Sequence, residues 1–198
     1  DSSGNPIWLK EYGDLSEDEF RDLIVTSEGK FAAAGYSTGG DETQKRLWFL
    51  LSDNNGNILT EKTFADSEED AAHAIIETQD GNFVIAGYAV MNEKKMMRIL
   101  KIDPEGNVIF DLPFNPGNIN EIHDIIEAPN GSIYACGTYR VQPLTDYDDM
   151  LAKISPEGDL LFRKTYGRHA WEEATSIVYT FDDFLVIGGF EKSDDGLY

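Results

Sequence analysis

TQDGNFVIAGY, residues 78–88, is a polar turn followed by an apolar run that ends in a glycine and an aromatic residue. Related stretches stand at residues 26–36 (TSEGKFAAAGY), 128–138 (APNGSIYACGT) and 180–189 (TFDDFLVIGG), the last of which aligns as one residue shorter at its turn. Each stretch has a glycine near its end, and these glycines lie 52, 50 and 51 residues apart: Gly35, Gly87, Gly137 and Gly188. A second series of glycines is spaced by 52, 50 and 52 residues: Gly4, Gly56, Gly106 and Gly158. Two independent landmarks with nearly the same period establish an internal repeat of about fifty residues, which is typical of propellers and solenoids.

Each repeat divides into four short apolar runs, which in the second repeat are residues 73–78, 82–88, 97–102 and 107–114. Turn signals separate them, with Gly81 after the first run and Pro104 and Gly106 after the third. Proline presets φ and glycine accepts a positive φ, as such turns require. The runs are rich in β-branched and aromatic residues and too short for typical helices, so they indicate strands.

The expected fold is therefore all-β, a β-propeller of about four four-stranded blades, because a single blade cannot bury both of its faces. Residues 1–198 form one domain in this interpretation. The repeats are expected at about residues 14–64, 66–114, 117–166, and 168–198 together with 1–12.

The two ends of the chain fall within one repeat. The last repeat reaches its second strand at residues 184–190, and Leu197 and Tyr198 stand where a third strand begins. Residues 4–13 correspond to a fourth run, so we expect the N-terminal strand to close the last blade and protect its edge. About four residues are missing from the register between the two ends, which leaves two alternatives: a short strand, or a window cut from a longer array.

Composition limits the classes of partner. The chain has 16 basic and 37 acidic residues, a net charge of −21, which disfavours nucleic acid and anionic membranes. A hydrophobic content of 41% indicates a folded chain, and we expect a monomer. Cys136 is the single cysteine, which excludes an internal disulfide and favours a buried, inert thiol. No apolar run approaches the roughly 20 residues of a transmembrane helix.

The runs AIIETQDGNFVIAGY and RILKIDPEGNVIFDLPF, with their counterparts elsewhere, resemble the bacterial β-propeller repeats of the delta-60 type. That resemblance covers essentially the whole chain and implies a propeller fold and an extracytoplasmic location: secreted, periplasmic or at the cell surface. It names no catalytic group and no cofactor. Kelch repeats are a second comparison, but their double glycine is found only at Gly188 and Gly189. Quinoprotein-type repeats place a tryptophan where Trp8 stands, yet the other repeats lack it, so no quinone cofactor is carried over.

The candidate binding positions lie just before the repeated stretch. In a propeller the first strand of each blade is innermost, and counting back five residues from the end of that strand gives four equivalent positions: Arg21, His73, His123 and Thr175. We expect them around the mouth of the central channel. Acidic residues precede them and would form a rim: Asp18, Asp70, Glu121 and Glu172. The variable loop at residues 140–149 adds Tyr147 and Asp148 to the same face, where specific binding is most often built.

The residue types of this face bear on several chemistries. His73 and His123 could ligate a transition metal, but two histidines without an assured third ligand favour ordinary polar residues of the channel. The acidic rim has no calcium-loop spacing, and the sequence contains no nucleophile elbow, zinc-protease motif or phosphate-binding loop. No metal site and no cofactor are therefore predicted.

The primary hypothesis is a non-enzymatic, exported propeller module that binds an unknown protein, peptide or glycan through this acidic face. One alternative is a carbohydrate-active enzyme with an acid and a base among the rim carboxylates. Another is a structural spacer within a longer repeat array.

Overall fold

The computed structural model describes residues 2–14, 17–39, 44–117, 120–140, 147–167 and 171–192. Within this part of the chain every regular element is a strand, and fourteen strands form four antiparallel sheets. The predicted all-β class is confirmed. Within the described ranges no helix has the length and apolar composition needed to cross a membrane.

The four sheets follow the repeats of the sequence. The first contains β1 (Asp18–Val25), β2 (Phe31–Ser37), β3 (Arg46–Ser52) and β4 (Ile58–Phe64). The second contains β5 (Glu69–Glu77), β6 (Phe83–Met91), β7 (Lys94–Ile102) and β8 (Val108–Gly117). The third contains β9 (Glu121–Glu127), β10 (Ile133–Tyr139), β11 (Asp148–Ile154) and β12 (Leu160–Tyr166), and the fourth contains β13 (Trp171–Tyr179) and β14 (Leu185–Lys192).

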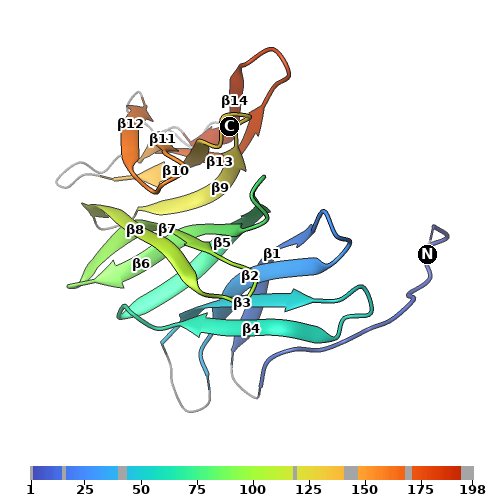
Figure 1. The fold of residues 1–198 in the computed structure, drawn as a ribbon. Helices are drawn as coiled ribbons and strands as arrows, with labels where there is room; N and C mark the ends of the chain where they lie inside the picture. The colour runs from blue at the N-terminus through green and yellow to red at the C-terminus, as the bar shows by residue number, and fades with distance from the viewer. Residues whose placement is uncertain are drawn as a thin grey trace.

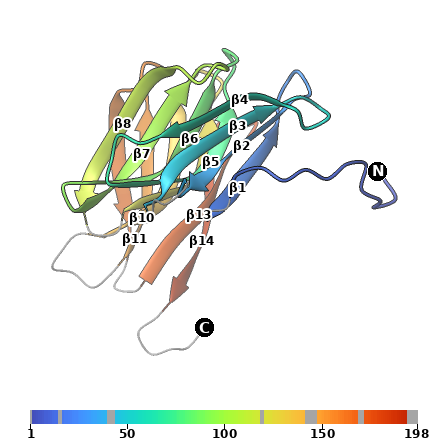
Figure 2. The same cartoon turned by 90° about the horizontal axis from the view of Figure 1, so that it is seen from below.

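The sheets pack face to face like the leaves of a fan, with a hydrophobic core between each neighbouring pair (Figures 1 and 2). Phe49 packs with Ile85 between the first and second sheets, and Ile99 packs with Ala135 between the second and third. The second sheet is covered on both faces, which explains why β6 is a continuous apolar run and does not alternate. Cys136 lies in the core between the third and fourth sheets, and burial raises the pKa of its thiol to about 12.

One strand of each sheet lies on the inner side of the fan. These strands touch in series, β1 with β5, β5 with β9, and β9 with β13. Among the described residues β13 makes no comparable contact with β1, so the four sheets form an open arc. The third strand expected at Leu197 and Tyr198 lies outside the described residues.

Part of the N-terminal segment, from Trp8 to Tyr12, contacts the first sheet (Figure 1). The third strand with which this segment is expected to pair lies outside the described residues, so closure of the last blade stays a prediction. Trp8 packs edge-on to Phe31 at 5.8 Å between ring centroids, and its indole N–H donates to the carbonyl of Asn54 over 3.2 Å. The Tyr12 hydroxyl donates to the carbonyl of Gly56 over 2.8 Å.

Strand β4 makes the same kind of contact with the second sheet, where Thr60 donates to the carbonyl of Pro104 over 2.8 Å. The N-terminal segment therefore takes the position on the first sheet that β4 takes on the second. The fourth runs of the first and second repeats likewise lie beside the next sheet in the series, with Lys62 near Gly106 and Phe110 near Gly158.

The turns show that the fourth repeat is not shortened. The amide of Thr180 donates to the carbonyl of Phe184 over 2.8 Å, as that of Thr78 donates to Asn82 over 2.8 Å. Asp183 has a positive φ of 67°, at the turn position where the other repeats have glycine. Aspartate tolerates this conformation better than most residues. The glycine equivalent to Gly87 is consequently Gly189, and the prediction of Gly188 is wrong by one residue.

Candidate functional site

All four positions predicted for the channel mouth are extra residues of β-bulges in the inner strands. In β5, Ala72 pairs with Gly87 and Ala74 pairs with Ala86, so His73 has no cross-strand partner. The same shift leaves one residue extra in each of the other three inner strands: Arg21, His123 and Thr175. A bulge turns its extra side chain away from the regular alternation of the strand. One backbone device therefore recurs at four equivalent positions of the inner strands, where it presents an arginine, two histidines and a threonine.

The repeated glycine makes this bulge sterically allowed. A Cβ on Gly87 would overlap the carbonyl oxygen of Ala71 and lie 3.0 Å from the Cα of Ala72. The equivalent glycines would collide with the inner strand in the same way: Gly35, Gly137 and Gly189. The glycine of TQDGNFVIAGY thus permits the close approach that positions the candidate site residue.

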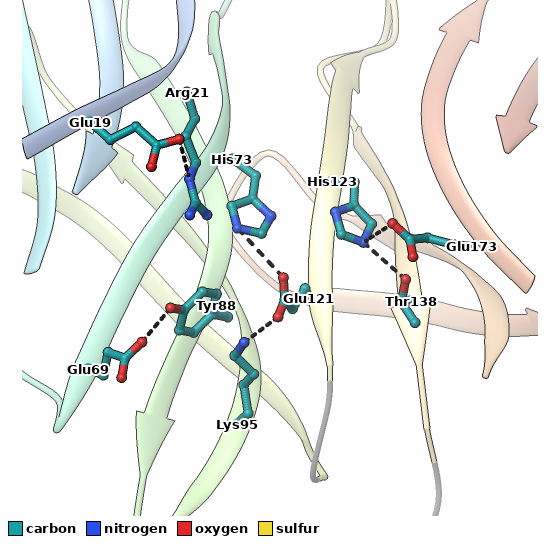
Figure 3. Close-up of polar contacts among 10 residues, drawn as sticks. All are labelled: Glu19, Arg21, Glu69, His73, Tyr88, Lys95, Glu121, His123, Thr138 and Glu173. Atoms are coloured by element: carbon teal, nitrogen blue, oxygen red, sulfur yellow. Dashed lines mark hydrogen bonds and ion pairs between the residues drawn. The ribbon is translucent and has the colours of Figure 1, made fainter. Parts of the chain in front are cut away.

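His73, Glu121 and His123 form a cluster on β5 and β9. The two imidazole rings stack with centroids 5.4 Å apart and planes at 12°, and Figure 3 shows the Glu121 carboxylate beside them. Nε2 of His73 lies 3.6 Å from Oε2 of Glu121. One potential ligand atom from each of the three residues lies within 4.8 Å of the others. Sequence reasoning placed these residues near one another but left the third ligand unassigned.

Each histidine faces a glutamate of the next repeat. Nε2 of His123 lies 3.5 Å from Oε1 of Glu173 and 3.0 Å from the hydroxyl oxygen of Thr138. Glu121 and Glu173 both stand two residues before the bulge, where the second repeat has Ala71. Counting from the repeated glycine shows that Glu121 and Glu173 occupy equivalent positions, but it does not show which histidine each glutamate faces.

Basic and aromatic groups surround Glu121. Lys95 donates a hydrogen bond to its Oε1, and the Lys95 ammonium lies 3.6 Å from the ring centroid of Tyr88. The Tyr88 hydroxyl donates in turn to Glu69 over 2.5 Å. Neither Lys95 nor Tyr88 is among the site residues predicted from the sequence, since neither lies on an inner strand.

Burial fixes the protonation of this cluster. Burial lowers the pKa of His73 to about 4, against the opposing charge of Glu121, and it also lowers the pKa of His123. Burial acts to raise the pKa of Glu121, but the hydrogen bond and charge of Lys95 outweigh it and hold that pKa below its usual range. At neutral pH the cluster therefore contains two neutral imidazoles and one carboxylate, all with lone pairs available.

The remaining inner positions are separate from this cluster. Arg21 pairs with Glu19 at 3.3 Å and lies 5.0 Å from the Tyr36 ring, on the side of His73 (Figure 3). The Thr175 hydroxyl donates to the carbonyl of Gly188 over 3.4 Å. Asp18 accepts a hydrogen bond from the amide of Asp14 over 2.9 Å.

Asp70 does not belong to the rim, contrary to the prediction. It is fully buried, and its Oδ1 accepts a hydrogen bond of 2.9 Å from Arg98, whose side chain is 1% exposed. Arg98 also binds both carboxylate oxygens of Asp111, over 2.9 and 2.8 Å. Alternation along β5 turns Asp70 into the sheet packing, where burial raises the pKa of its carboxyl.

Tyr147 and Asp148 lie at the start of β11. Tyr147 belongs to a second group of residues, together with Trp171 and Glu172. Tyr147 stacks on Trp171 with centroids 4.3 Å apart and planes at 12°, and its carbonyl accepts the amide of Glu172 over 2.9 Å. Glu172 is nearly buried here, so it is not an exposed rim carboxylate. The rest of the predicted loop, residues 141–146, lies outside the described residues.

The fold and this site define an all-β repeat protein that presents non-equivalent side chains from equivalent bulges. No protein-family model and no curated protein matches the chain. A solved structure titled "Crystal structure of the eukaryotic initiation factor" aligns with 79% of this chain and 35% of its own, with a TM-score of 0.45 and 10% identity. The chain spans about a third of that structure, and a likeness of this degree carries no argument about fold or function.

Proposed function

We propose that this chain is a non-enzymatic binding module of β-propeller type, which recognises a partner at the bulge positions of its inner strands. One observation carries the proposal: four bulges of the same geometry present four positions occupied by arginine, histidine, histidine and threonine. A scaffold that needs only to pack would have no reason to vary the residues that its bulges aim inward. Variation on a repeated framework is typical of binding surfaces.

The charge around these positions favours a neutral or cationic polar partner. Glu19, Glu121 and Glu173 stand beside the bulges, and the whole chain has a net charge of −21. A polyanion would be repelled by this field over about a Debye length. The side chains of Arg21 and His123 are 26% and 20% exposed, so a partner could reach them.

Catalysis on carbohydrate receives less support. That alternative took its acid and base from four rim carboxylates, of which Asp70 is buried against Arg98 and Glu172 is nearly buried. Glu121 is held as a carboxylate by Lys95, which does not suit a general acid. Export of the module, and closure of its sheets into a ring, rest on the resemblance of the repeat and belong to the same proposal.

The test is a binding screen of the purified protein against immobilised glycans and a cationic peptide library. A triple variant, Arg21→Thr, His73→Thr and His123→Thr, replaces the three larger bulge residues with the one that the fourth repeat carries at Thr175. We expect ligands of the native protein to lose binding to this variant while its unfolding transition stays cooperative, since threonine already occupies an equivalent bulge.

A matched control removes charge from the opposite ends of the strands. Glu28→Gln with Glu157→Gln changes two exposed turn residues and should leave binding unchanged. If the control loses binding and the triple variant keeps it, the partner binds at the turns that carry Glu28 and Glu157. The proposal then fails.

A further inference from the structure

We propose that His73, Glu121 and His123 form a binding site for a divalent transition-metal ion of the zinc class. The site uses side chains of two neighbouring sheets, so it exists only once the second and third repeats have packed. The site shares His73 and His123 with the proposed partner surface, but ion binding requires no partner, since the ion needs only these three side chains.

The donor set fits this class of ion. Two imidazole nitrogens and one carboxylate oxygen suit zinc, copper or nickel, whereas calcium and magnesium prefer oxygen ligands throughout. Three protein ligands with a fourth position left for water are a recurrent arrangement for zinc. This chemistry separates the cluster from the general acidity of the surface, which would attract any divalent cation weakly.

Nε2 of His73 is the strongest indication of a missing partner. This atom is buried, and within the described part of the chain it has no hydrogen-bond partner. Oε2 of Glu121 lies 3.6 Å from it, beyond hydrogen-bond distance. A buried polar atom without a partner needs an explanation, and an ion between the two side chains would supply one.

The neighbouring contacts are compatible with an ion at this place. Lys95 binds Oε1 of Glu121 and leaves Oε2 facing His73. Thr138 binds Nε2 of His123, and Figure 3 shows the other ring nitrogen of His123 turned toward His73. A histidine held through its outer nitrogen is the usual second-shell arrangement, because it orients the ligating nitrogen.

Binding requires a small contraction of the cluster. The candidate ligand atoms lie within 4.8 Å of one another, whereas ligand atoms around a tetrahedral zinc with bonds of about 2.0–2.1 Å are roughly 3.4 Å apart. Side-chain rotation can close this gap, since the side chains of His73, Glu121 and His123 are 12%, 19% and 20% exposed and are not locked by the core. The nearby ammonium of Lys95 opposes the ion, and the carboxylate of Glu173 offsets it.

The experiment is titration of the metal-free protein with zinc chloride by calorimetry, at about 0.15 M salt with magnesium in excess to saturate weak surface sites. We expect one zinc ion per chain. His73→Thr and His123→Thr should each weaken binding by at least about a hundredfold, since even second-shell changes cost ten- to a hundredfold. Threonine is the natural occupant of the equivalent position at Thr175, so the bulge should be kept.

Two further measurements make the result decisive. Cobalt replacing zinc should give the visible absorption of a tetrahedral site in the native protein and lose it in both threonine variants. The control Glu11→Gln removes one exposed carboxylate far from β5 and β9 in sequence and should bind zinc as the native protein does.

The inference is overturned if the native protein takes up no zinc under these conditions. It is equally overturned if both threonine variants bind zinc as tightly as the native protein, because the ion then lies elsewhere. Partner binding measured with a chelator present tests the proposed function separately, so failure of one proposal can be told from failure of the other.

Discussion

Replacing Gly87 with alanine tests the central structural claim, that the repeated glycine permits the bulge at His73. The new Cβ would overlap the carbonyl oxygen of Ala71 and lie 3.0 Å from both the carbonyl carbon of Ala71 and the Cα of Ala72. These atoms belong to the backbone of β5, so no rotation of a side chain can relieve the overlap. Overpacking of this kind costs about 1–3 kcal/mol.

Against this cost stands the loss of conformational freedom in the unfolded chain, which stabilises a Gly→Ala variant by about 0.4–1 kcal/mol. The net expectation for Gly87→Ala is therefore a decrease of about 1–2 kcal/mol in the free energy of unfolding. Gly188→Ala is the matched control, because a Cβ there would meet no atom within 4 Å and the equivalent residue of the second repeat is Ala86.

Urea unfolding of the two variants, followed by tryptophan fluorescence and circular dichroism, measures the difference. The Gly188→Ala variant should be as stable as the native protein or more stable. The urea midpoint of Gly87→Ala should therefore lie clearly below that of Gly188→Ala. Equal stability of the two variants would refute the reasoning, since it would mean that the strand can move away at no cost. Zinc uptake by folded Gly87→Ala should also fall, because a straightened β5 would re-aim His73.

Two other predictions concern buried charge. Arg98→Met should cost about 3–5 kcal/mol, because it leaves the carboxylate of Asp70 buried without its counter-ion; chemical unfolding measures this, and a loss below about 1 kcal/mol would contradict it. Asp149→Asn should stabilise the protein at neutral pH, because burial and the nearby Glu172 raise the pKa of Asp149. Because the carboxyl pKa is higher in the folded state, the stability of the native protein falls as pH rises through that pKa. The stabilisation by Asp149→Asn should therefore vanish below about pH 4, where Asp149 is protonated in both the folded and the unfolded state. If Asp149→Asn stabilises the protein equally in acid and at neutral pH, the effect comes from packing and not from the charge of Asp149.

Much of the fold follows from local signals in the sequence. The period, the strands and the turns come from spacings of a few residues, and turn glycines with apolar runs specify them without reference to the rest of the molecule. The four bulge positions could be predicted for the same reason, because each lies at a fixed distance from its repeated glycine. The fourth turn was misaligned because Asp183 adopts the positive φ that glycine provides elsewhere.

The packing between repeats could not be predicted in the same way. The contacts of Trp8 and Tyr12 with the first sheet depend on how the sheets stack, and no local signal in the sequence specifies them. The acidity of Asp70 and its closeness to His73 in the sequence predict a position on the rim. Only the alternation of β5 and the position of Arg98 show that it is buried.

The sequence by itself thus determined an all-β repeat and the four positions that its bulges aim inward. The tertiary structure alone decided which groups meet there, placing Glu121 beside His73 and Glu173 beside His123. The physical reason is that each pair joins residues about fifty positions apart on neighbouring sheets. Their separation is set by how the apolar faces between those sheets interlock, and no local spacing in the chain encodes that distance.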